Sequence, residues 1–161
     1  MKDLGAAKFI LGMEIKRDHA NMKLWLNQRK YVETILQRFN MHGSKPVKIP
    51  IPIGVNLSID QCPKTWEDKE DMSHVLYASA VGSLMYEIVC TRENIAHAVR
   101  VLSRYMSKLG NEHWTTIKRN FRYLRGTVDY AIYYQGRHEI EKMLDGHVFF
   151  DTDSVEIFII E

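Results

Sequence analysis

Two aspartates one residue apart, Asp151 and Asp153, follow an apolar pair in the stretch FFDTDS near the end of the chain. Carboxylates at the end of a strand are typical of sites that hold Mg²⁺ for phosphoryl transfer, where several acids surround two metal ions. The alternative is a polar end to a strand with no chemistry. The choice between them depends on whether the chain supplies further acids to the same place.

The sequence offers little other catalytic chemistry. It contains no Gly-rich phosphate loop, H-E-x-x-H, paired C-x-x-C or G-x-S-x-G motif. Glu93 and His97 stand at i, i+4, but no further ligand accompanies them, so packing or hydrogen bonding is the favoured role of His97. Cys62 and Cys90 are isolated, have no evident base, and are expected to remain reduced thiols. We therefore do not expect a self-contained enzyme.

The basic segment is more informative. Seven basic residues and one acid lie between Arg100 and Gly126, after an acidic stretch from Asp60 to Ser73. Lys118, Arg122 and Arg125 recur at i, i+4, i+7 and form one stripe on a helix, with Arg119 about a quarter-turn away. Such a stripe suits contact with the phosphates of a nucleic acid. A solvated helix face explains the spacing equally well, and both readings stay open.

Composition bounds the remaining classes. The chain has 161 residues, 45% hydrophobic and 26% charged, with a formal net charge of +2, as in ordinary globular proteins. No apolar run reaches the roughly 20 residues that span a bilayer, and the start of the chain does not resemble a signal peptide. We expect an intracellular location, cytoplasmic or nuclear, and no membrane partner.

The apolar pattern predicts an α+β fold. A strand over Ala7–Lys16, with a bulge or a close backbone approach at Gly12, and a return strand over Lys23–Gln28 form a hairpin. Asn27 caps an amphipathic helix that ends near Asn40. All four prolines then fall in a long connection.

Three helical segments follow, over 73–91, 92–108 and 111–126, the last capped by Asn111 and ended by Gly126. Strands are predicted over Asp129–Gly136 and His147–Asp151. The expected organisation is a hairpin over 1–26, a helix over 27–42, a linker over 43–73, a helical unit over 74–126 and strands over 127–161. The helices from Tyr77 to Gly126 should form the best ordered unit, whereas an isolated hairpin would be marginally stable.

Long ordered stretches carry a family resemblance. YASAVGSLMYEIVCTRENIAHAVRVLSRYMSK, followed by EHWTTIKRNFRYLRGT, resembles the pol polyprotein of copia-type (long-terminal-repeat) retrotransposons, especially those of plants. MKDLGAAKFILGMEI and LWLNQRKYVETILQRFNM resemble it too, so the likeness runs from Met1 to Gly136 and more weakly to Asp153. The matching family segment is the thumb and connection of reverse transcriptase, up to the start of ribonuclease H.

This resemblance implies roles for particular residues. Gly12 and Met13 would lie near the primer strand, in a segment that resembles the primer grip. Asp151 would stand at the first metal-ligand position of ribonuclease H, although the sequence after Asp153 departs from the family pattern. The Tyr-x-Asp-Asp motif of the family precedes this segment. We therefore expect a non-catalytic fragment with no cofactor of its own, in which Asp151 is a vestigial ligand of the Mg²⁺ that the parent family uses.

Three functions stay open at this stage. The chain is a non-catalytic remnant of the polyprotein with residual affinity for an RNA–DNA duplex, a domesticated module that binds RNA–DNA or DNA duplex, or a trans-acting subunit of a split reverse transcriptase. In the last case its partner is the remainder of the polyprotein. The candidate nucleic-acid contacts are Gly12, Met13, Lys118, Arg119, Arg122 and Arg125.

Overall fold

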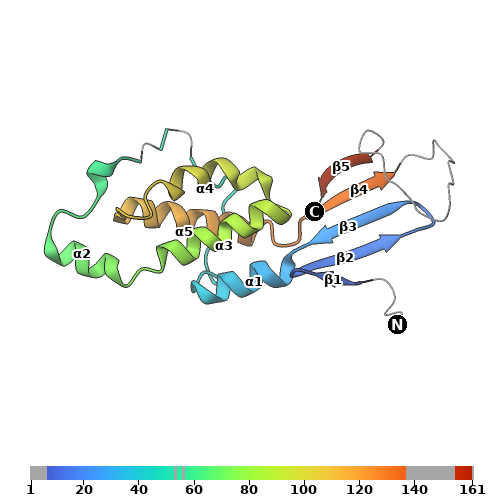
Figure 1. Ribbon diagram of the computed structural model, residues 1–161, viewed down its shortest axis with the longest axis horizontal. Helices are drawn as coiled ribbons and strands as arrows, with labels where there is room; N and C mark the ends of the chain where they lie inside the picture. Colours follow the sequence, from blue (N-terminus) through green and yellow to red (C-terminus); the bar gives the residue numbers. More distant parts are fainter. Residues whose placement is uncertain (1–6, 53, 56, 137–154, 161) are drawn as a thin grey trace. The chain divides into compact units, whose positions relative to one another are not determined.

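The computed structural model describes residues 7–52, 54–55, 57–136 and 155–160, and it confirms the α+β class (Figure 1). The chain folds into two compact units. Met1–Arg29 and Asp129–Glu161 form one, called the sheet unit, and Lys30–Val128 form the other, called the helical unit. The strands are β1 (Phe9–Ile10), β2 (Met13–Asp18), β3 (Lys23–Asn27), β4 (Ala131–Gly136) and β5 (Val155–Ile160). The helices are α1 (Arg29–Arg38), α2 (Trp66–Ser73), α3 (Tyr77–Cys90), α4 (Ala96–Ser103) and α5 (Asn111–Gly126).

The sheet unit contains an antiparallel five-stranded sheet in the order β1-β2-β3-β4-β5. The predicted hairpin is confirmed as β2 and β3. Asp18 stabilises its turn, since its carboxylate accepts hydrogen bonds from the Asn21 amide at 3.2 Å and the Asn21 side chain at 2.7 Å. The turn chemistry of Asp and Asn in the sequence therefore fixes where this hairpin reverses.

Gly12 lies in a chain reversal and not in a bulge. Ile10 pairs with Met13, which leaves Leu11 and Gly12 as the two residues of a tight turn between β1 and β2. Their φ angles are +50° and +76°. A turn with positive φ at both positions matches the twist of the flanking strands, and glycine adopts such angles without a steric cost. The prediction of one strand over Ala7–Lys16 is therefore wrong.

The hairpin does not stand alone. β4 pairs with β3 from Asn27–Ala131 to Lys23–Gln135, and β5 pairs with β4. The expectation of an isolated, marginal hairpin is wrong, because strands about a hundred residues apart in sequence complete the sheet. The predicted strand over His147–Asp151 lies outside the described residues.

The helical unit has the main core, and the three predicted helices are confirmed within it. Apolar residues at helical spacing on α1, α3, α4 and α5 pack together. The fully buried members include Val32, Val81, Leu84, Leu102, Ile117, Phe121 and Leu124. α4 is shorter than predicted and follows a 3₁₀ turn over Glu93–Ile95. The segment predicted as a linker contains the short helix α2.

The cap of α5 differs from the prediction. Gly110 precedes the helix and Asn111 is its first residue. The Gly110 N–H donates to Nδ1 of His113 at 3.0 Å, so a side chain one turn into the helix satisfies this buried amide. A Cβ on Gly110 would collide with the carbonyl oxygen of Gln61. This position requires glycine because the backbone of Gln61 passes close to it.

Candidate nucleic-acid interface

Helix α5 separates its apolar and basic residues as the sequence predicts. Ile117, Phe121 and Leu124 are fully buried in the core of the helical unit. Lys118 is exposed, and Arg119, Arg122 and Arg125 are half-buried. The four cations therefore differ in how much of each side chain reaches solvent, a difference that helical spacing alone does not reveal.

Lys118 has the most accessible charge of the four. Its Nζ lies 5.6 Å from the centroid of the Trp114 ring, which is within the range of a cation–π contact. Trp114 in turn packs edge-on against Phe39 of the segment after α1, with ring centroids 6.5 Å apart. An aromatic side chain anchored to the core thus supports an exposed ammonium group.

Arg122 and Arg125 hold a neighbouring segment to α5. Nε of Arg122 donates to the carbonyl oxygen of Lys45 at 2.7 Å, and Nη1 of Arg125 donates to the carbonyl oxygen of Ser44. The Val47 N–H returns a bond to the Arg122 carbonyl at 3.4 Å. These two arginines therefore have a structural role. A guanidinium has five N–H donors, so one bond leaves the others for an anion.

Arg119 presents a different situation. Its Nε is buried and has no hydrogen-bond partner within the described part of the chain. The side chain as a whole remains partly exposed. A buried donor without a partner is costly, so a water or an anionic ligand at this guanidinium would lower its free energy.

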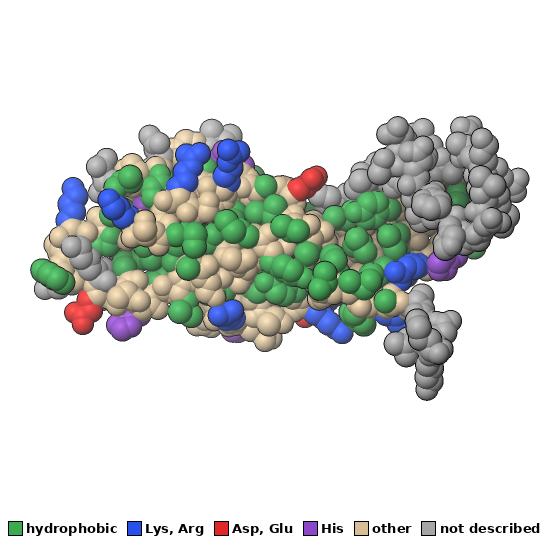
Figure 2. Space-filling view, in the orientation of Figure 1, with side chains coloured by type: hydrophobic (Ala, Val, Ile, Leu, Met, Phe, Trp, Pro, Cys, Tyr) green, Lys and Arg blue, Asp and Glu red, His purple; other side chains and the backbone are tan. Residues whose placement is uncertain are grey.

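Further exposed cations lie before α5. Arg100, Arg104 and Lys108 are all exposed, at the end of α4 and just after it. Figure 2 shows Lys and Arg side chains gathered over α4. Together with Lys118 they supply the exposed positive charge of the basic segment. We call these four residues, Arg100, Arg104, Lys108 and Lys118, the exposed cations.

The other predicted site residues lie elsewhere. Gly12, exposed, and Met13, half-buried, belong to the sheet unit, whereas the cations of α5 belong to the helical unit. Asp151 lies outside the described residues. Among the described residues, no group of three His, Cys, Asp or Glu side chains could hold a metal ion. No helix in that part of the chain is long and apolar enough to cross a membrane.

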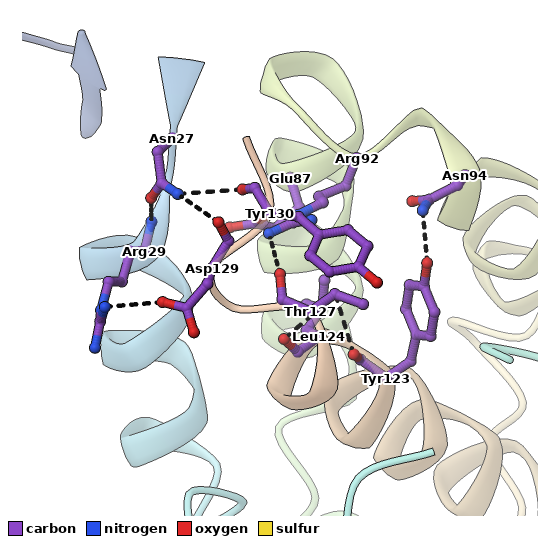
Figure 3. Close-up of polar contacts among 10 residues, drawn as sticks. All are labelled: Asn27, Arg29, Glu87, Arg92, Asn94, Tyr123, Leu124, Thr127, Asp129 and Tyr130. Carbon is purple, nitrogen blue, oxygen red and sulfur yellow. Dashed lines mark hydrogen bonds and ion pairs between the residues drawn. The ribbon is translucent and has the colours of Figure 1, made fainter. Parts of the chain in front are cut away.

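A buried ion pair was not predicted. Glu87 of α3 and Arg92 are both buried, and Oε2 of Glu87 lies 3.9 Å from Nε of Arg92 (Figure 3). Nη2 of Arg92 donates to the carbonyl oxygen of Thr127 at 2.6 Å, just after α5. Burial raises the pKa of Glu87 to about 7, although the positive charge of Arg92 acts in the opposite direction.

A sequence signal for this pair existed. Glu87 follows Ala80 and Leu84 at i+7 and i+3, so it falls on the apolar stripe of α3. An acid on such a stripe needs a partner in the core. The 3₁₀ turn between α3 and α4 is also linked to α5, because the Asn94 side chain donates to the Tyr123 hydroxyl at 2.6 Å (Figure 3).

Comparisons with known proteins find Pol polyproteins of plant transposons and an uncharacterized mitochondrial protein. The retrovirus-related Pol polyprotein from transposon TNT 1-94 of Nicotiana tabacum is 51% identical over 142 residues, which are 88% of this chain and 11% of the polyprotein. The Pol polyprotein from transposon RE2 of Arabidopsis thaliana is 37% identical over 125 residues, 78% of this chain and 8% of the polyprotein. An uncharacterized mitochondrial protein of Arabidopsis thaliana is 33% identical over 153 residues, 95% of this chain and 58% of that protein.

The chain thus spans about a tenth of the length of the two polyproteins and somewhat more than half of the mitochondrial protein. No protein-family model and no solved structure matches it.

Proposed function

Because this chain is a homologue of one segment of the copia-type retrotransposon Pol polyproteins, we propose that it serves in their reverse transcriptase region as a non-catalytic part that contacts nucleic acid. The observation that supports this proposal best is the set of exposed cations, defined above, on and beside α4 and α5. The ligand proposed is an RNA–DNA duplex, whose two phosphate backbones attract cations irrespective of base sequence.

The cations have graded roles in this proposal. Lys118 is exposed and contacts a phosphate directly. Arg122 keeps its bond to Lys45 through Nε and offers its remaining donors to the duplex. Arg119 gains a partner for its buried Nε region only when an anion or water arrives. Binding is therefore expected to depend on salt and not on sequence.

A salt titration tests the proposal. Affinity of the purified chain for a fluorescent RNA–DNA hybrid is measured by anisotropy between about 50 and 200 mM salt, where each phosphate contact adds about −0.9 to the slope of log K against log salt. Lys118→Ala should flatten the slope by about one contact. Lys64→Ala, which removes an exposed lysine from the acidic stretch Asp60 to Ser73, is the matched control and should leave the slope unchanged. A slope near zero for the unchanged chain overturns the proposal.

The proposal assigns no phosphoryl transfer to this segment by itself. Reactions of this class need several carboxylates around two metal ions. We expect no primer extension on an RNA template with Mg²⁺ and deoxynucleotides, and template-dependent synthesis above background would sink this part of the proposal.

One experiment distinguishes the two alternative functions from each other. A trans-acting subunit of a split reverse transcriptase would stimulate synthesis when mixed with a second chain that carries the Tyr-x-Asp-Asp segment. A domesticated binding module would bind duplex equally well with or without that chain. Co-purification with the second chain, together with increased synthesis, favours the first alternative over the second.

A further inference from the structure

A hollow on one face of the sheet unit has no role in the function proposed above. It has a volume of about 360 Å³, and its lining includes Glu14 and Lys16 from β2, Trp25 from β3, and the pair Arg29–Asp129. All of these residues belong to the sheet unit. The lining joins an aromatic ring to charges of both signs, which is the kind of surface that binds a ligand with a flat ring and an anionic group.

Aromatic and basic side chains stand next to each other on this face because of the strand register. Trp25 pairs with Lys16 across β2–β3 and with Tyr133 across β3–β4, so the three side chains point to the same side. The two rings are 5.4 Å apart between centroids and tilted by 37°. Nζ of Lys16 lies 5.5 Å from the centroid of the Trp25 ring.

The rings are held but accessible. Trp25 and Tyr133 are both half-buried, whereas Lys16 is exposed. The Tyr133 hydroxyl donates to Oε1 of Gln135 at 2.6 Å, which fixes the outer end of this ring. Aromatic side chains fixed on the open face of an antiparallel sheet are a recurrent surface for stacking unpaired bases.

The edge of the hollow is rigid. Asn27 uses its whole amide: Oδ1 accepts from the Arg29 N–H at 2.5 Å, and Nδ2 donates to the carbonyl oxygens of Asp129 and Tyr130 at 3.3 and 3.2 Å (Figure 3). Arg29 Nη1 meets Asp129 Oδ1 at 2.8 Å, with both side chains more than half exposed. Arg29 therefore supplies a second cation to the lining of the hollow, and its backbone and guanidinium are both held by hydrogen bonds.

We propose that this hollow binds one unpaired nucleotide of a single-stranded nucleic acid, with the base stacked on Trp25 and the phosphate near Lys16 or Arg29. The Trp25 ring supplies a surface for any base, and the neighbouring cations supply attraction for the backbone. The site is separate from the exposed cations of the helical unit, and its binding of single strands does not require that those cations bind a duplex.

The first test separates stacking from charge. The full chain is titrated by anisotropy with a labelled eight-nucleotide DNA strand and with an abasic strand of equal length, which keeps the phosphates and lacks the bases. We expect the normal strand to bind more tightly. Trp25→Ala should weaken binding of the normal strand about 5- to 150-fold, the range for loss of one stacked base, and leave the abasic strand unaffected.

Two matched variants serve as controls for the binding test. Trp66→Ala removes an exposed tryptophan of the helical unit and should leave single-strand binding unchanged. Trp25→Phe keeps an aromatic ring in the strand and should retain most of the affinity. Equal binding of the normal and abasic strands by the unchanged chain would overturn the proposal. A Trp25→Ala variant that binds the normal strand as tightly as the unchanged chain does would also overturn it.

A second measurement needs no change at Trp25. In a Trp66→Phe, Trp114→Phe background, Trp25 is the remaining tryptophan of the chain. A saturating single strand should quench its emission, whereas the abasic strand should not. Unaltered emission at saturation would refute stacking on this ring. If the chain does not bind duplex in the salt titration but the single strand still quenches Trp25, the function proposed for the helical unit is wrong. The site proposed in the sheet unit is then still supported.

Discussion

The substitution Glu87→Gln tests most directly whether the buried Glu87 beside Arg92 destabilises the helical unit when it is ionised. It removes a charge and keeps the shape of the side chain. Both carboxylate oxygens of Glu87 are buried without a hydrogen-bond partner among the described residues. Nε of Arg92 lies 3.9 Å away, which is beyond hydrogen-bonding distance. The protonated acid therefore suits this site better than the carboxylate.

The magnitude follows from the pKa. Burial raises the pKa of Glu87 from its ordinary value of 4.5 to about 7. Each pKa unit corresponds to about 1.4 kcal/mol, so the ionised state costs about 3 kcal/mol of stability. Below pH 4.5 the group is protonated in both folded and unfolded chains, and the cost is absent. The cost grows between pH 4.5 and 7, where only the unfolded chain ionises, and it is constant above pH 7.

The assay is urea unfolding followed by circular dichroism at pH 5 and pH 8. At pH 5 we expect Glu87→Gln and the unchanged chain to have similar free energies of unfolding. At pH 8 the variant should be more stable by up to about 3 kcal/mol. Glu93→Gln, which changes an exposed acid of the same unit, should shift stability equally little at both pH values.

The opposite result would refute the reasoning. If Glu87 and Arg92 form a net favourable ion pair, removing the carboxylate leaves a buried guanidinium without its counterion. Loss of one partner of a buried pair costs about 3–5 kcal/mol. A Glu87→Gln variant that is less stable than the unchanged chain at pH 8 would therefore show that Arg92 offsets the desolvation of the carboxylate.

Three further substitutions test the packing around α5, two by urea unfolding and the third by limited proteolysis. Gly110→Ala should destabilise the chain by about 1–3 kcal/mol, because the new Cβ meets the Gln61 carbonyl, whereas Asn111→Ala next to it should cost well under 1 kcal/mol. Phe121→Ala should cost about 3–5 kcal/mol, since this fully buried ring stacks on Phe39 at 4.8 Å; a loss below 1 kcal/mol would contradict that packing. Arg122→Ala should increase proteolytic cleavage near Lys45, because its bond to that carbonyl is lost, and an unchanged cleavage rate would argue against the tether.

Helical periodicity allowed most of the helical unit to be predicted. The spacing of Ile117, Phe121 and Leu124 identifies the buried face of α5, and the same pattern works for α1. The stop at Gly126 was also correct. The cap was misplaced because Asn111 is a common N-cap type, whereas the deciding factor at Gly110 is the approach of the Gln61 backbone. Such an approach involves a segment distant in sequence and leaves no local pattern.

The sheet was harder to predict for a related reason. Alternation identifies β2 and β3 as a hairpin but says nothing of what lies beside β3. The partner, β4, comes after the whole helical unit in the sequence. The hollow beside Trp25 depends on this pairing, because Asp129 and Ala131 line it and Tyr133 of β4 packs against the Trp25 ring. A site built from two strands so far apart could not be found from the spacing of its residues.

The basic stripe shows how far charge spacing can be trusted. Spacing places Lys118, Arg122 and Arg125 on one side of α5, and this is correct as a statement about the helix. It cannot show that Ser44 and Lys45 pass over the same side and accept bonds from the two arginines. A guanidinium can hold a carbonyl and a phosphate together, because its five N–H donors lie in a planar fork that points in several directions. Arg122 and Arg125 can therefore hold the Ser44–Lys45 segment and still present positive charge to a ligand. Lys118 is exposed and contributes charge to the surface.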